Sequence, residues 1–120
     1  MKLGSVLTLV SGLALLGCSY PLEGGWAVTA NCPADSAFGA LVIRAKATAT
    51  EVQTNEFVGE ITNDLGQRGQ FRASLQNNLL LTETNWDGLP PTTSRLTLDR
   101  SSGSFTGVDS MGCSLIVVRP

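Results

Sequence analysis

The sequence Leu-Val-Ile-Arg-Ala-Lys-Ala-Thr-Ala-Thr, residues 41–50, decides the fold class. Its odd positions carry Leu41, Ile43 and three alanines, whereas Arg44, Lys46 and two threonines lie between them. Successive side chains of a β-strand point to opposite faces, so this period of two predicts a strand with one apolar face and one face in water.

The same alternation continues along the chain, and turn-forming residues separate the segments. Residues 63–69 contain two glycines and predict a hairpin loop, while Asn77 and Asn78 predict a two-residue hairpin because asparagine tolerates positive φ. Residues 87–91 end in two prolines and predict a longer connection, since proline is excluded from central strands. The expected strands are 25–31, 38–45 with an extension to 51, 57–62, 70–76, 79–86, 95–100, 104–108 and 113–118.

Three of these segments repeat a short pattern in which a small residue follows a phenylalanine two positions later. The phenylalanines are at 57, 71 and 105, and the small residues are Gly59, Ala73 and Gly107. The pattern predicts that the small residue lets the ring of a neighbouring strand lie across the sheet, or marks a bend of the sheet.

The amino terminus has the composition of an export signal. Met1 and Lys2 precede residues 3–16, which carry no charge. A membrane-spanning helix needs about 20 apolar residues, whereas the apolar region of a secretory signal needs roughly 7 to 15. An ordinary cleaved signal and a buried apolar helix are the alternatives, and the helix fits worst because glycine and serine interrupt it.

Leu15-Leu16-Gly17-Cys18, at the end of this region, resembles the lipobox of bacterial lipoproteins. The resemblance implies cleavage before Cys18 and lipidation of its thiol, and Ser19 in place of aspartate implies the outer membrane of the cell envelope. Two acyl chains anchor a protein stably to a membrane. We therefore expect a signal peptide at 1–17, a lipidated tether at 18–25 and a single domain at 26–120.

If Cys18 carries lipid, the remaining cysteines, Cys32 and Cys113, form a pair. Disulfides persist in the oxidising periplasm, and a metal site would need further soft or imidazole ligands. We expect a disulfide that brackets most of the domain.

Such a bridge makes the two ends of the strand series neighbours. The sequence therefore predicts an all-β fold, a small antiparallel meander barrel of about eight strands closed by one disulfide. A β-sandwich is the alternative. Its immunoglobulin form fits poorly, because Trp26 precedes the first cysteine of the pair and Trp86 comes too late after it.

Gly24-Gly25-Trp26 resembles the Gly-x-Trp start of the calycin group, which comprises the lipocalins and smaller barrels. The resemblance implies that the tryptophan closes one end of the barrel and that a late arginine, Arg119 or Arg100, packs on its ring. Trp26 and Trp86 are the candidate ligand-binding residues. Residues 101–104, Ser-Ser-Gly-Ser, are loosely similar to the Ser-Gly loop of periplasmic lysozyme inhibitors.

Composition excludes several classes of function. With 8 basic and 10 acidic residues and a net charge of −2, the chain lacks the basic surface that nucleic acid binding needs. The absence of histidine removes the commonest general base and metal ligand. Glu56 and Glu60 share a strand face at about 13 Å, beyond the roughly 5 to 9.5 Å of glycosidase carboxylates. We expect no enzyme activity, no cofactor and no metal.

Three hypotheses for the function remain. The first is a non-catalytic binding module for a protein, a glycan or a small apolar ligand. The second is a structural or accessory lipoprotein, with a hydrolase inhibitor as a variant, and the third is a hydrolase that uses carboxylates alone. An apolar cavity lined by Trp26, Trp86 and the Phe-x-Gly faces would favour the first, and a filled interior with an exposed apolar patch the second.

Overall fold

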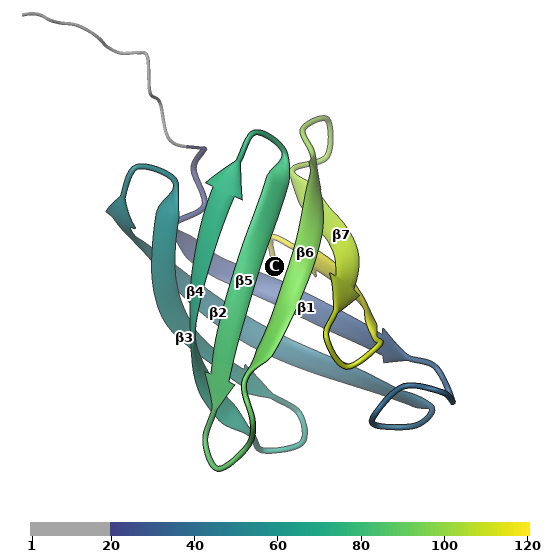
Figure 1. The fold of residues 1–120 in the computed structure, drawn as a ribbon. Helices are drawn as coiled ribbons and strands as arrows, with labels where there is room; N and C mark the ends of the chain where they lie inside the picture. The colour runs from purple at the N-terminus through teal and green to yellow at the C-terminus, as the bar shows by residue number, and fades with distance from the viewer. Residues whose placement is uncertain (1–19) are drawn as a thin grey trace, which may run out of the picture.

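The computed structural model describes residues 20–120, which form eight antiparallel strands (Figure 1). The signal peptide expected at 1–17 and Cys18 lie outside the described residues. Within residues 20–120, no helix is long and apolar enough to span a membrane. The strands are β1 (Gly24–Cys32), β2 (Leu41–Gln53), β3 (Glu56–Asn63), β4 (Arg68–Gln76), β5 (Leu79–Trp86), β6 (Thr92–Asp99), β7 (Ser104–Asp109) and β8 (Ser114–Val118).

The strands close into one barrel in sequence order. Each strand pairs with the next, and β1 pairs with β8 from Ala27↔Val118 to Asn31↔Ser114. The predicted all-β meander barrel is therefore confirmed, and the sandwich alternative is wrong.

Two strand boundaries differ from the expectation. Residues 33–40 form a loop rather than the start of β2, because Ser36 N donates to Pro33 O and Gly39 has a φ of 74°. β6 begins at Thr92 rather than Arg95, because Thr92 pairs with Thr84 directly after the two prolines.

Within the expected tether at 18–25, the described residues 20–25 are partly packed into the barrel. Leu22 is buried in the main core cluster, and Gly24 and Gly25 belong to β1. Gly24 has a φ of 108°, which favours glycine, and this conformation starts the first strand.

The predicted disulfide between Cys32 and Cys113 is present. Cys113 is fully buried, and the bridge joins the end of β1 to the residue before β8. It therefore lies at the closing seam of the barrel, across a sequence separation of 81 residues.

The barrel has two different ends. We call the end with the 54–55, 77–78 and 100–103 turns, Tyr20 and Pro120 the closed end. The opposite end, called the mouth, carries the connections 33–40, 64–67, 87–91 and 110–113. In Figure 1 the closed end is uppermost and the mouth lies below it.

The Phe-x-Gly pattern corresponds to close approaches inside the sheet. A Cβ on Gly59 would lie 2.7 Å from Cζ of Phe71 and would overlap the carbonyl oxygen of Thr48. A Cβ on Gly107 would likewise overlap the carbonyl oxygen of Arg95. Gly59 thus accommodates the ring of the neighbouring strand, as predicted, and both glycines allow close backbone contact.

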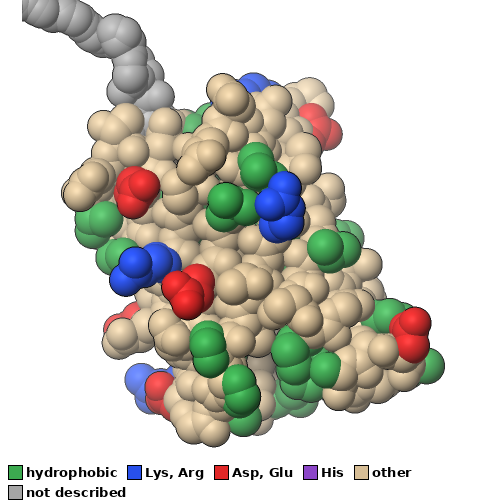
Figure 2. All heavy atoms as spheres, in the orientation of Figure 1, with side chains coloured by type: hydrophobic (Ala, Val, Ile, Leu, Met, Phe, Trp, Pro, Cys, Tyr) green, Lys and Arg blue, Asp and Glu red, His purple; other side chains and the backbone are tan. Residues whose placement is uncertain are grey.

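The outer surface of the barrel is mostly polar without being highly charged. On the face in Figure 2, Lys, Arg, Asp and Glu side chains are scattered and lie among hydrophobic side chains and a larger area of backbone and other side chains. Large apolar residues such as Val58, Val108 and Ile116 are also exposed on the outer face. Uncharged polar side chains such as Thr48 and Gln76 are exposed on the strands as well.

Candidate ligand-binding site

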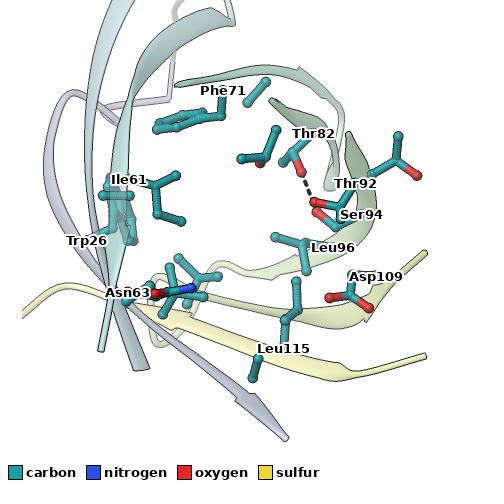
Figure 3. Close-up of a pocket in the computed structure, with 18 of the residues that line it drawn as sticks. Trp26, Ile61, Asn63, Phe71, Thr82, Thr92, Ser94, Leu96, Asp109 and Leu115 are labelled. Carbon is teal, nitrogen blue, oxygen red and sulfur yellow. Dashed lines mark hydrogen bonds between the residues drawn. The ribbon is translucent and has the colours of Figure 1, made fainter. Parts of the chain in front are cut away.

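The interior of the barrel contains a cavity of about 250 Å³. Inward side chains of all eight strands line it (Figure 3). The alanines at 45, 47 and 49 in β2 form part of this wall. An eight-stranded barrel has room for packed side chains or for one small ligand. Small residues on β2 leave part of this space unfilled.

Trp26 forms the floor of the cavity at the closed end. Its Nε1 donates a hydrogen bond of 2.7 Å to the carbonyl oxygen of Leu22, which is itself buried. Its ring meets Phe105 edge to face, with 5.7 Å between the ring centroids. These contacts fix the indole across the end of the barrel.

Of the two late arginines, Arg119 packs on Trp26. Its Cζ lies 4.0 Å from the indole centroid, a cation–π geometry. Arg119 also donates hydrogen bonds to the carbonyl oxygens of Pro21, Glu23 and Gly25, at 2.7, 2.9 and 3.0 Å. One side chain thus ties the end of the chain to the segment that covers the floor.

Arg100 has a different aromatic partner. Its Cζ lies 5.3 Å from the ring centroid of Tyr20, and its Nε donates to Oδ1 of Asn78 at 2.7 Å. Arg100 therefore holds the start of the described chain against the neighbouring turns of the closed end.

Trp86 lines the cavity near the mouth, at the end of β5. Its Nε1 donates a 3.0 Å hydrogen bond to Oγ1 of Thr92 on β6. Phe38, Leu89 and Met111 come from the mouth loops and also line the cavity. Both tryptophans predicted from the sequence therefore face the same cavity, one at each end.

Four hydroxyl side chains at inward positions of β5 and β6 also line the cavity, and they were not among the residues predicted from the sequence. Thr82 pairs with Ser94 and Thr84 pairs with Thr92 in the strand register. We call these four residues the hydroxyl wall. In Figure 3 the labelled members lie across the lumen from Trp26 and Ile61. The signal in the sequence was the alternation of β5 and β6, which places these hydroxyl residues on the same strand face as the apolar residues of the interior.

Asp109 is the one charged residue among those that line the cavity. Its Oδ1 accepts hydrogen bonds from the backbone N–H groups of Met111 and Cys113, both at 2.9 Å. The carboxylate thereby shapes the turn at the mouth. Within residues 20–120, no group of three acidic or cysteine side chains is arranged to hold a metal ion.

The Ser-rich loop lies at the closed end, away from the mouth. Ser101 donates to Asp99 through both its hydroxyl, at 2.6 Å, and its backbone N–H, at 3.0 Å. These bonds lower the pKa of Asp99 from its ordinary value of 3.8. Ser102 and Ser104 hydrogen bond to each other at 2.7 Å. The loop is thus held by its own side chains.

Comparison with known proteins gives no relative: no protein-family model matches the chain, and no curated protein or solved structure is significantly similar to it.

Proposed function

We propose that this protein is a non-catalytic binding module that holds one small, mainly apolar ligand inside the barrel. The observation that carries the proposal is the cavity of about 250 Å³ with two tryptophans and several phenylalanines in its wall. Ligand sites are typically concave and apolar, with a few placed polar groups.

The volume sets the size of the ligand. A cavity of about 150 Å³ in another protein binds benzene, so a proportionate ligand here has roughly ten non-hydrogen atoms. An empty cavity forgoes packing contacts that larger inward residues would supply. The alanines of β2 are therefore better suited to a ligand-filled barrel than to a purely structural one.

The proposal includes a lipid anchor at Cys18 in the bacterial envelope. Support comes from the lipobox-like sequence and from the entry of the chain at the closed end, where Tyr20 lies against Arg100. An anchor two residues before Tyr20 would hold the closed end near the membrane and leave the mouth pointing away from it. Protein or glycan partners, an accessory role and hydrolase inhibition remain predictions.

Binding of propylbenzene tests the ligand proposal, because this molecule is apolar and close to the expected size. The full chain carrying Cys18→Ser, purified without detergent, is titrated by calorimetry and by tryptophan fluorescence. We expect saturable binding at one site with a change in emission, since both tryptophans line the cavity.

Two variants of β2 provide the matched comparison. Ala45 faces the cavity, whereas Thr48 is exposed on the outer face of the same strand. Ala45→Phe should fill the space and weaken propylbenzene binding at least about tenfold, a loss of roughly 1.4 kcal/mol. Thr48→Phe should leave it unchanged. Absence of saturable binding to the parent, or equal binding by a folded Ala45→Phe protein, would contradict the proposal.

A further inference from the structure

We infer that the ligand carries an uncharged oxygen group, such as a hydroxyl, ketone or ester, which accepts hydrogen bonds from the hydroxyl wall. The inference rests on the proposed function and assigns the chemical class of the ligand. The hydroxyl wall occupies one side of a cavity that is otherwise mostly apolar, so the bound molecule would be apolar at one end and polar at the other.

The hydrogen bonds within the hydroxyl wall leave some of its O–H groups free to donate to a ligand. The hydroxyl oxygens of Thr82 and Ser94 lie 2.5 Å apart, and either can donate to the other. Whichever donates, the partner keeps its own O–H proton. Thr92 accepts from the indole of Trp86, so its O–H proton is not used in that bond.

Thr84 supplies the strongest evidence. Thr84 is only 8% exposed and lines the cavity. Its hydroxyl makes no hydrogen bond within the part of the chain that the structure describes. A buried hydroxyl without a partner is costly, and most buried polar side chains are paired. A ligand oxygen beside Thr84 would satisfy this group.

The register of β5 and β6 concentrates these donors. Thr82↔Ser94 and Thr84↔Thr92 are consecutive inward pairs of adjacent strands, so the four hydroxyls form a two-by-two patch. Ser94, like Thr84, is only 8% exposed. A single oxygen placed at the patch would be within the reach of more than one donor.

The charge of the lining favours a neutral ligand group over an ionised one. No lysine or arginine is among the residues that line the cavity, and the charged member, Asp109, is an anion. A ligand carboxylate would lose its hydration without gaining a cation. A ligand ammonium could pair only with Asp109 among the lining residues, and because Oδ1 accepts two backbone N–H groups, Oδ2 is the oxygen left for a cation. One such partner does not replace the hydration that a buried ammonium loses.

Four molecules that share a phenyl ring and a short chain test this inference. They are propylbenzene, 2-phenylethanol, 3-phenylpropanoate and phenylethylammonium, each titrated into the full chain carrying Cys18→Ser at pH 7. We expect 2-phenylethanol to bind at least as tightly as propylbenzene. Both ions should bind at least about tenfold more weakly than the alcohol.

Conservative substitutions then locate the polar contact. Thr84→Val and Ser94→Ala should each weaken 2-phenylethanol about fivefold, the loss of one neutral hydrogen bond, without weakening propylbenzene. Thr97→Val is the matched control, because Thr97 is exposed on the outer face of β6. Circular dichroism verifies that each variant remains folded.

The outcomes separate this inference from the proposed function. If no molecule binds, the cavity is not a ligand site and both fail. If propylbenzene binds but the alcohol is unaffected by Thr84→Val and Ser94→Ala, the proposed function stands and the hydroxyl-wall inference is wrong. Tighter binding of either ion than of the alcohol would also overturn it.

Discussion

Gly59 illustrates at the residue scale how one absent methyl group shapes the barrel. Phe71 crosses the position that a side chain would occupy, and the carbonyl oxygen of Thr48 approaches from the other strand. Glycine in a strand ordinarily weakens it, so its presence here reflects a close approach. The ring of Phe71 gains its position in the cavity wall through this contact.

Gly59→Ala should destabilise the protein by about 1 to 3 kcal/mol, because the added methyl overlaps backbone as well as ring atoms. The control is Gly25→Ala in β1, where a Cβ would meet Pro120 at an ordinary 3.9 Å. This control should change stability by no more than about 0.5 kcal/mol. Urea denaturation of both variants gives the comparison. Equal stability of the two would show that the sheet relaxes around residue 59.

Single residues also mark the limit of prediction from sequence. The Phe-x-Gly pattern predicted either a neighbouring ring lying across the small residue or a bend of the sheet, and Gly59 has the first of these, with the ring of Phe71 against it. The hydroxyl wall was not predicted, because only the register of β5 and β6 shows that Thr84 and Ser94 lie close together inside the barrel. Threonine is common in strands on either face.

At the scale of elements, the segment Tyr20–Leu22 acts as a cover over the closed end. Its backbone accepts from Arg119 and from the indole of Trp26, and Leu22 is buried. This segment belongs to the tether expected at 18–25, in which proline and glycine disfavour regular secondary structure. Irregular backbone nevertheless packs well when a long side chain from elsewhere satisfies its carbonyl groups.

Arg119→Ala should destabilise the protein by about 2 kcal/mol, through the loss of three charge-assisted hydrogen bonds and the cation–π contact. Arg119→Lys should recover part of this loss, because an ammonium keeps the charge but not the planar array of donors. The control is Arg95→Ala, on the exposed outer face of β6. Thermal and urea denaturation measure the effect. If Arg119→Ala is no less stable than Arg95→Ala, the closed end does not depend on this side chain.

At the scale of the whole molecule, sequence periodicity gave the number and order of strands, and the cysteine pair gave closure. The size of the cavity was not available from the sequence, which could not tell a hollow interior from one filled by ordinary core packing. The volume of the cavity depends on how closely the inward side chains of all eight strands pack together. The three alanines of β2 are small, so they leave part of the interior unfilled. Periodicity reports the direction of a side chain, not the space left beside it.

The lipid anchor also belongs to the whole molecule, since it would set the orientation of the barrel. Radiolabelled palmitate should be incorporated into the wild-type protein and not into the Cys18→Ser variant. The variant should keep the barrel fold. Two acyl chains suffice for stable membrane attachment, so the wild type should remain in the membrane fraction after high-salt washing. Wild-type protein without label would show that the lipoprotein proposal is wrong.

The seam between β1 and β8 has a consequence for folding kinetics. Seven of the eight strand pairings join neighbours in sequence, but the last joins residues 27–31 to residues 114–118. Contacts so distant in sequence form slowly, because chain entropy must be lost before they contribute stability. The seam can close only after nearly the whole chain is present, because β8 is the last strand in the sequence. Until then, β1 has an unpaired edge that can pair with a strand edge of another chain. Oxidation of Cys32 and Cys113 after closure would then trap the completed barrel and remove that edge from further exchange.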